Sequence, residues 1–430
     1  MKSPISRRQF LKLGSVIPTW AMASEIINFF PLNLFAQDGR PQFFVLIMVD
    51  GGMDTTLGLD PRTHQNGEDQ KDIFIEYRPE QIIQSGNLRL GPAALALKDH
   101  AKDFSIINGV NMRRDAGHES NREYLASGSG DGKKPFLPVE SAHYLKNLGP
   151  AGILQLNASV RLGNYEFTTT DLQQTFNDSQ SSEKNSDEYL ENLSDSISAY
   201  ESAVLSYKEI SGPLKIIGTE LMSENPNVQL SQISKEKVIA KMFQKKLSFQ
   251  AVVSIRGNNL DTHSNHAGED GVPGPHWTNQ AKVWANVAEY FTLFKNTKFA
   301  EGSLFDYTTF MVVTEFSRTP FLNNSKGKDH NPLTNSVLLA GPQFKAGQVI
   351  GGSHVIRRSD KSVASHIGTP IDYTTGKLIQ VGDVSYKKNK SINFIYPENI
   401  ARTVMQSFGG VVAGSSMDKS APLIPGILKT

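Results

Sequence analysis

Short runs of apolar residues recur along the chain and predict buried strands. The first run covers residues 43–49 and ends at Asp50, which is followed by two glycines. A continuous apolar run of this length is typical of a strand that is buried on both faces, and the glycines indicate a turn after it. We expect further strands of the same kind at residues 104–107, 251–255, 309–313 and 336–339.

Helical patterns separate several of these runs. An apolar stripe from Val283 to Phe294 falls on one face of a helix, and a second stripe begins at Val238. Strands that alternate with helices favour a mostly parallel sheet with helices on both of its faces. The predicted fold class is therefore α/β, with a doubly wound, mostly parallel sheet.

One region breaks this alternation. From about residue 168 to 195 the chain is rich in Ser, Asp, Glu, Asn and Gln, and an apolar helical stripe runs from Ile197 to Tyr207. We interpret residues 165–232 as an inserted loop and helical cap on a single domain that extends over residues 37–430. A second irregular loop is expected at residues 268–275.

The amino-terminal segment has the pattern of an export signal. Residues 6–12 read Ser-Arg-Arg-Gln-Phe-Leu-Lys, which matches the twin-arginine motif, and a moderately apolar stretch follows to residue 35. Pro18 and Glu25 are among the residues that interrupt this stretch, whereas a membrane span needs about 20 nearly unbroken apolar residues. We therefore predict a signal peptide over residues 1–36. The alternatives are a basic surface turn before a short helix and an uncleaved membrane anchor.

Two cleavage positions follow small residues, one after Ala23 and one after Ala36. We prefer the later one, because a polar segment begins directly after it. The predicted partner is the twin-arginine export machinery, and the predicted location is periplasmic, cell-envelope or secreted, with no stable membrane span after cleavage. Because this route carries proteins that are already folded, often with a metal or cofactor inserted, it also suggests a metal site.

Replacing both Arg7 and Arg8 with Lys is expected to retain the protein in the cytoplasm, because the paired arginines define the export motif. Cell fractionation followed by immunoblotting measures the distribution. The matched control is Arg40→Lys, which lies beyond the predicted signal and should leave export unchanged. Normal delivery of the double variant to the periplasm would contradict the predicted route.

Composition restricts the chemistry that a site could use. The chain has 44 Lys and Arg against 43 Asp and Glu, so it lacks the basic excess that nucleic-acid binding normally requires. It has no Cys, which excludes disulfides, thiolate metal sites, Cys nucleophiles and iron–sulfur clusters. A protein without Cys also suits an oxidising compartment. Any metal must therefore be bound by imidazole and carboxylate groups.

Polar residues gather just beyond the predicted strands, where open α/β sheets bind their ligands. Four of the 10 His, at positions 118, 263, 266 and 330, lie in these segments, and each is close to a carboxylate. Imidazole and carboxylate groups bind zinc, manganese or iron, and mixed Asp and His sets are common in two-metal sites that process phosphates. We predict one or two divalent transition metals. The candidate ligands are Asp50, Asp54, Asp261, His263, Glu315, Asp329 and His330.

Each candidate also has a purely structural interpretation. An Asp at a strand end often only forms a turn, and Glu315 with Arg318 could be an ordinary ion pair. Ser120 and Glu123 have the spacing of a capping box, so Ser120 is predicted to begin a helix. In the functional interpretation Ser120 is the hydroxyl nearest the metals, since a helix amino terminus stabilises an alkoxide or a phosphate.

The order of the motifs carries a resemblance over residues 41–415. The motifs are Asp50-Gly51-Gly52-x-Asp54, a segment with His118, Asp261-Thr262-His263, Thr314-Glu315-Phe316-Ser317-Arg318-Thr319-Pro320 and Gly327-Lys328-Asp329-His330. This order resembles a family of twin-arginine-exported bacterial proteins of unknown function, which is similar to the alkaline phosphatase and sulfatase superfamily. The resemblance implies an alkaline-phosphatase-like fold with a metal site at the strand ends.

The resemblance also implies individual roles. Asp50 would bind one metal, and Asp261 and His263 would bind the other, with Glu315 as the late carboxylate and His330 as the closing histidine. Three departures matter. The phosphatase pattern spaces its Asp and His further apart than Asp261-x-His263, and His266 is an alternative ligand at a different spacing. Glu315-Phe316 stands where the phosphatase pattern has an Asp-His pair. Related sequences tend to have Ser directly before the histidine at position 118. This chain has Gly117 there, which makes Ser120 the nearest hydroxyl.

Two functions from different classes are compatible with these residues. The first is an exported metal-dependent hydrolase of phosphate or sulfate esters, acting on a small molecule or a polysaccharide. Its catalytic residues would be Ser120, His118 and Arg318, and Arg318 or Arg114 would hold a substrate oxygen. The second is a non-catalytic exported protein of the same fold that binds a partner or an envelope polysaccharide.

Overall fold

The computed structural model describes most of the chain after residue 42. The described residues are 43–63, 73–113, 116–147, 149, 151–167, 169–172, 174, 217, 220–221, 223, 234–256, 258–268, 271–357, 364–379, 391–410 and 417–429. The predicted signal peptide, Arg114 and most of the predicted insertion at 165–232 lie outside them. Within the described residues, no helix combines the length and the apolar character needed to cross a membrane.

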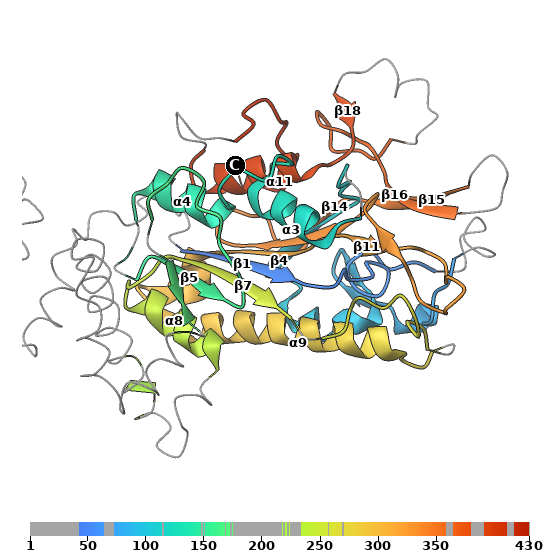
Figure 1. The fold of residues 1–430 in the computed structure, drawn as a ribbon, viewed down its shortest axis with the longest axis horizontal. Helices are drawn as coiled ribbons and strands as arrows, with labels where there is room; N and C mark the ends of the chain where they lie inside the picture. Colours follow the sequence, from blue (N-terminus) through green and yellow to red (C-terminus); the bar gives the residue numbers. More distant parts are fainter. Residues whose placement is uncertain are drawn as a thin grey trace, which may run out of the picture.

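An eight-stranded sheet forms the centre of the protein (Figure 1). Its strands are β1 (Phe43–Val49), β4 (Phe104–Asn108), β5 (Ile153–Leu156), β6 (Thr169–Asp171), β7 (Gln250–Ile255), β10 (Thr308–Thr314), β13 (Ser336–Ala340) and β14 (Val349–Gly351). The order across the sheet is β14-β4-β13-β10-β1-β7-β5-β6. Only β13 runs antiparallel to its neighbours, β10 and β4, so the sheet is mostly parallel as predicted.

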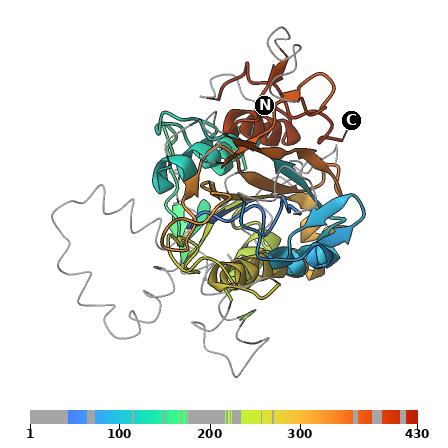
Figure 2. The same ribbon diagram turned by 90° about the vertical axis from the view of Figure 1, so that its right-hand side faces the viewer.

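Helices cover both faces of this sheet, and all five predicted strands lie within it. On one face lie α3 (His118–Ser127), α4 (Leu137–Leu145) and α11 (Pro397–Ser407), and on the other α8 (Lys235–Gln244), α9 (Pro275–Asn296) and the 3-10 segment η3 (Pro92–His100). Figures 1 and 2 show the sheet between these two layers. The α/β class and the helices at 238 and 283 are therefore confirmed.

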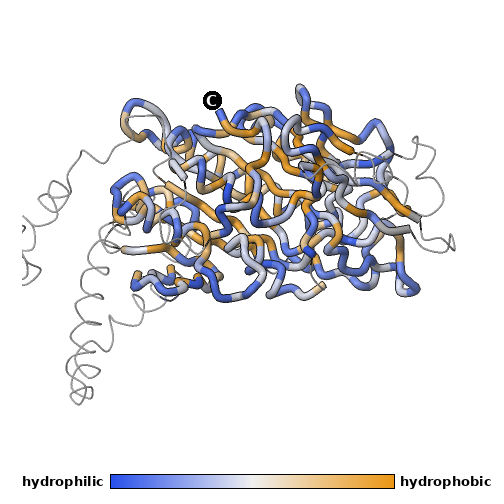
Figure 3. The backbone as a smooth tube through the Cα atoms, turned by 90° about the horizontal axis from the view of Figure 1, so that it is seen from above, coloured by the Kyte–Doolittle hydropathy of each residue, from blue (hydrophilic) through white to orange (hydrophobic). Residues whose placement is uncertain are grey.

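The central strand β1 supplies side chains to both layers. Val45 and Ile47 pack into the core with α8 and α9, whereas Phe44 and Leu46 pack into the core with α3, α4 and α11. Successive side chains of a strand point to opposite faces, so a strand covered on both sides must be apolar at every position. Figure 3 shows the same arrangement as hydrophobic segments inside and hydrophilic segments around them.

Shorter elements complete the fold. They are η2 (Pro79–Gln81), η5 (Leu304–Tyr307) and the paired strands β2 (Ile83–Ser85) with β3 (Leu88–Leu90), β8 (Lys298–Phe299) with β9 (Gly302–Ser303), β11 (Ser317–Arg318) with β12 (His330–Asn331), β15 (Ser353–Arg357) with β16 (Ala364–Gly368), and β17 (Ile371–Asp372) with β18 (Ile392–Asn393).

The start of the predicted insertion differs from expectation. Residues 169–171 form β6, which pairs in parallel with β5 at one edge of the main sheet. This strand was not predicted, because its sequence Thr-Thr-Asp is polar. A three-residue edge strand with one buried side chain has no apolar run to detect.

Candidate metal centre

Three strands bring the site residues to one edge of the sheet. Val49 of β1 pairs with Thr314 of β10 and with Ile255 of β7. The residues that follow these strands therefore begin at the same level, about 4.8 Å apart from strand to strand. Because β13 runs antiparallel, the segment before it reaches this edge as well. That segment contains His330 in β12, which pairs opposite Arg318 in β11.

Three side chains bring ligand atoms close together, and a fourth contacts two of them. Ligand atoms of His118, Asp261 and His330 lie within 4.8 Å of one another. The Oδ1 atom of Asp261 is 3.0 Å from Nε2 of His330, and its Oδ2 atom is 3.5 Å from Nε2 of His118. Nε2 of His263 completes the group, at 3.1 Å from Asp261 Oδ1 and 2.9 Å from His330 Nε2.

The other ring nitrogen of each histidine already has an acceptor. Nδ1 of His118 donates to Oε1 of Glu315 at 2.7 Å, and Nδ1 of His263 donates to Oδ1 of Asp329 at 2.9 Å. Nδ1 of His330 donates to the carbonyl of Ala116 at 2.7 Å. These bonds fix the tautomer, so each neutral ring presents an unprotonated Nε2.

Unprotonated nitrogens and an ionised carboxylate repel one another at such distances unless a cation lies between them. Four ligands at about 2.0–2.1 Å from a tetrahedrally coordinated ion are separated from each other by about 3.3 Å. The measured contacts of Asp261 with His118, His263 and His330 range from 3.0 to 3.5 Å. The group therefore has the donor types and spacing of a metal site. We call these four residues the His/Asp cluster.

The cluster is open to solvent on one side. The side chains of Asp261 and His263 are 47% and 48% exposed, whereas Glu315 behind His118 is buried. The hydrogen bond to Glu315 raises the pKa of His118, while burial lowers the pKa of His330. The cluster therefore has a buried supporting side at Glu315 and a side that solvent reaches at Asp261 and His263.

Arg318 supports the cluster from inside the protein. Its side chain is fully buried, and its guanidinium donates to the carbonyls of Gly51, Gly52, Leu260 and Lys328 and to Oδ1 of Asp261. Partial burial opposes the ionisation of Asp261, but the hydrogen bond and the charge of Arg318 lower the pKa of its carboxyl to about 2. The prediction that Arg318 holds a substrate oxygen is wrong, because these bonds engage each of its nitrogens.

Asp50 does not join the cluster. Its Oδ1 atom accepts from Nη1 of Arg122 at 2.7 Å, and its Oδ2 atom lies 2.8 Å from Nε of Arg256. The prediction that Asp50 is a metal ligand is therefore corrected, since two guanidinium groups occupy both oxygens of its carboxylate.

Asp54 is buried next to a different cation. Its Oδ2 atom accepts from Nζ of Lys328 at 2.5 Å, and its Oδ1 atom accepts from the backbone N–H and the hydroxyl of Thr56. Although burial opposes ionisation, Lys328 holds the pKa of Asp54 well below its usual value. His266 lies 3.4 Å away, stacks on His276, and burial lowers its pKa to about 4. Asp54 and His266 are thus parts of a buried polar network.

The helix that follows β4 begins earlier than predicted. Gly117 is the N-cap of α3 and His118 is its first residue, so Ser120 lies inside the first turn. The Ser120 hydroxyl donates to the carbonyl of Gly117 at 3.3 Å. The capping prediction for Ser120 is therefore wrong. The Ser-x-x-Glu spacing suggested it, but the glycine three residues earlier takes the N-cap position.

Three contributors to the site were not predicted. Phe316 stacks on His330 with ring centroids 4.2 Å apart and meets His118 edge-on at 4.8 Å, so it holds both rings in place. Arg122 and Arg256 bind Asp50. A signal existed for each arginine, because Arg122 follows His118 by one helical turn and Arg256 directly follows the apolar run of β7.

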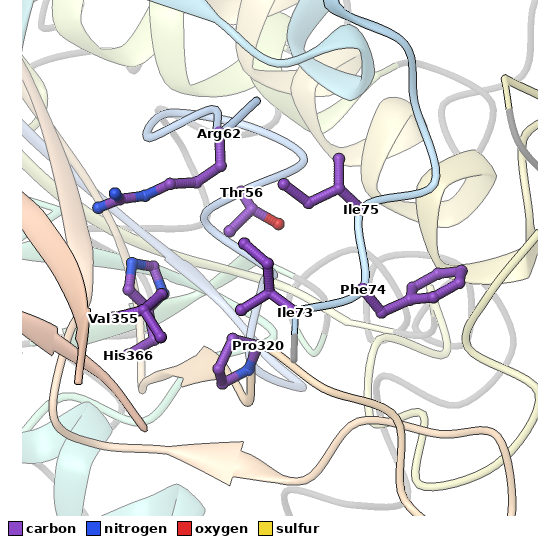
Figure 4. A pocket seen from close by; sticks show the side chains of 8 residues that line it. All are labelled: Thr56, Arg62, Ile73, Phe74, Ile75, Pro320, Val355 and His366. Atoms are coloured by element: carbon purple, nitrogen blue, oxygen red, sulfur yellow. The ribbon is translucent and has the colours of Figure 1, made fainter. Parts of the chain in front are cut away.

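A small cavity lies apart from the His/Asp cluster, and none of the four cluster residues lines it. Figure 4 shows its lining, which is Thr56, Arg62, Ile73, Phe74, Ile75, Pro320, Val355 and His366. Next to it, the Ser353 hydroxyl is bonded to Asp60, Arg62 and His366, which ties β15 to the loop after β1.

Comparison with known proteins gives a partial match. Residues 241–367, less than a third of the chain, match a family described as "Protein of unknown function (DUF1501)". No curated protein matches the chain. The matched segment contains Asp261, His263, Glu315, Arg318 and His330, but not Asp50 or His118. The match supports the expected link to an uncharacterised family, and the family description names no activity.

Proposed function

We propose that this protein is an exported metal-dependent hydrolase of phosphate or sulfate esters. The observation that supports this proposal most strongly is the His/Asp cluster, in which three imidazoles with fixed Nδ1 protons turn their Nε2 atoms toward the carboxylate of Asp261. The proposed substrate class is based on the resemblance to the alkaline phosphatase and sulfatase superfamily, and the proposed location is based on the twin-arginine motif.

The donor set fits one divalent transition metal better than two. Imidazole and carboxylate donors suit zinc, manganese or iron. Asp50, the expected ligand of another metal, is neutralised by Arg122 and Arg256, and Phe316 stands where the phosphatase pattern has an imidazole. A bound ion would act as a Lewis acid toward an ester oxygen and toward water.

The protein groups around the ion have distinct tasks in this proposal. Glu315 and Asp329 orient His118 and His263 through their Nδ1 protons. Arg318 keeps Asp261 ionised. The open side of the cluster would admit an ester and water. Water is the attacking group in this proposal, because the hydroxyl predicted as nucleophile, that of Ser120, is bonded to the carbonyl of Gly117.

The second candidate is a non-catalytic exported protein that keeps the metal and binds a partner or an envelope polysaccharide. Two observations favour it: Arg318 is wholly engaged by the protein, and Ser120 does not present its hydroxyl to the cluster. Both candidates predict metal binding, and they differ in turnover.

Turnover of aryl phosphates and aryl sulfates by the exported protein separates the two candidates. We expect hydrolysis that is lost on chelation and regained when zinc or manganese is added.

Ser120→Ala is expected to leave turnover within about twofold of wild type and to change stability by less than about 1 kcal/mol, since it removes one half-exposed local hydrogen bond. Loss of turnover in Ser120→Ala with metal content intact would restore Ser120 as the nucleophile. No turnover of any ester by the metal-loaded protein would favour the second candidate.

A further inference from the structure

Two arginines share one carboxylate at the edge of the sheet. Arg122 uses Nη1 and Arg256 uses Nε to contact Asp50, and Nε of Arg256 also donates to the Ser254 hydroxyl at 3.2 Å. Within the described part of the chain, Nε and Nη2 of Arg122 and both Nη atoms of Arg256 have no hydrogen-bond partner. Asp50 thus fixes the two side chains, and donors of both have no partner among the described residues.

Two structural connections place this arginine pair beside the His/Asp cluster. Arg122 follows His118 by four residues on α3, so the two side chains share one helix face about 6 Å apart along the axis. The N–H of Gly51, next to Asp50, donates to Oε1 of Glu315 at 2.7 Å, and the same oxygen accepts from His118. The arginines therefore stand beside the cluster on the sheet edge.

The pair carries net positive charge, since two guanidinium groups face one carboxylate. The Arg256 side chain is 54% exposed and that of Arg122 is 23% exposed, so a solute can reach both. A guanidinium presents paired N–H donors that match two oxygens of a phosphate or sulfate. Arg318 cannot take this part because it is buried and engaged by the protein.

We propose that Arg122 and Arg256 form the subsite that binds the anionic ester group beside the metal, with Asp50 as the residue that positions them. The inference rests on the proposed function and names its ligand class, a tetrahedral oxyanion with at least two non-bridging oxygens. An oxyanion that contacts an ion with one oxygen and a guanidinium with another spans about 7 Å between them.

Calorimetric titration of the exported, metal-loaded protein with inorganic phosphate, and separately with inorganic sulfate, tests this subsite. Arg256→Gln is expected to weaken binding of the preferred anion at least about tenfold, the effect of losing a charge-assisted hydrogen bond, with metal content unchanged. Arg122→Gln should act similarly, and Arg256→Lys should recover part of the affinity. The control Arg89→Gln, at an exposed position of β3, should bind as wild type does. The two anions identify which ester class the subsite prefers.

The outcomes separate this inference from the proposed hydrolase. Equal anion affinity in wild type, Arg122→Gln and Arg256→Gln would overturn the subsite, even if the metal-loaded protein hydrolyses esters. Failure of the wild type to bind either anion at millimolar concentration would overturn it as well. Arginine-dependent anion binding by a protein that shows no turnover would support the subsite and refute the hydrolase. With turnover present, the variants should raise KM more than they lower kcat.

Discussion

Replacing Arg318 with Met is expected to lower the free energy of unfolding by about 3–5 kcal/mol. Arg318 is fully buried and donates to four backbone carbonyls and to Asp261. Met fills much of the same volume but donates no hydrogen bond, so these acceptors would lose a partner in a place that water reaches poorly. Removing one member of a buried charge network destabilises the protein by more than the net contribution of each hydrogen bond suggests, because the remaining groups stay buried without a partner.

Equilibrium denaturation with urea measures this change. The matched control, Arg89→Met, replaces an exposed arginine of β3 and should change stability by less than about 0.5 kcal/mol. Arg318→Lys keeps the charge but has one nitrogen in place of three, so it should recover only part of the loss. A decrease in unfolding free energy of less than about 1 kcal/mol in Arg318→Met would show that the hydrogen bonds of Arg318 do not hold together the loops that follow β1 and β7.

Replacing His263 with Gln is expected to reduce metal affinity more than about 100-fold, because even changes to residues that only orient metal ligands cost about 10–100-fold. His263 is the most suitable ligand to remove, since its half-exposed side chain adds little to the core. The unfolding free energy of the metal-free protein should therefore change by less than about 1 kcal/mol.

Competition with a chromophoric chelator measures the affinity, and elemental analysis measures the content after export. The control is His143→Gln on α4, whose ring stacks on Tyr165 away from the His/Asp cluster. His143→Gln should retain wild-type affinity. Equal metal affinity in His263→Gln and wild type would remove His263 from the ligand set.

The fold was largely predictable because the main strands are apolar at every position. Runs such as residues 43–49 can be read without tertiary information, since burial on both faces leaves no alternation to misread. The direction of β13 could not be read in this way. Parallel and antiparallel strands with both faces covered have the same composition, and only the connections decide between them. The polar edge strand β6 was missed for the opposite reason, the lack of an apolar run.

The site was predictable in its residue types and less so in their partners. Asp261, His263, His330 and His118 come together because the strand ends share one edge. Whether an acidic residue binds a metal or a cation of the protein depends on groups distant in sequence. Asp50 meets Arg122 from α3, and Asp54 meets Lys328, 274 positions away. The sequence places Arg122 one helical turn after His118, but its pattern does not pair Arg122 with Asp50 or Lys328 with Asp54.

An anomalous-difference map from crystals of the protein, exported and purified from its native host, tests the central claim most directly. We predict one peak from a transition metal, at about 2.0–2.2 Å from the Nε2 atoms of His118, His263 and His330 and from the Asp261 carboxylate. Absence of a peak at these four residues in protein that was never exposed to chelator, or a metal bound at Asp50 in place of Arg122 and Arg256, would contradict the account.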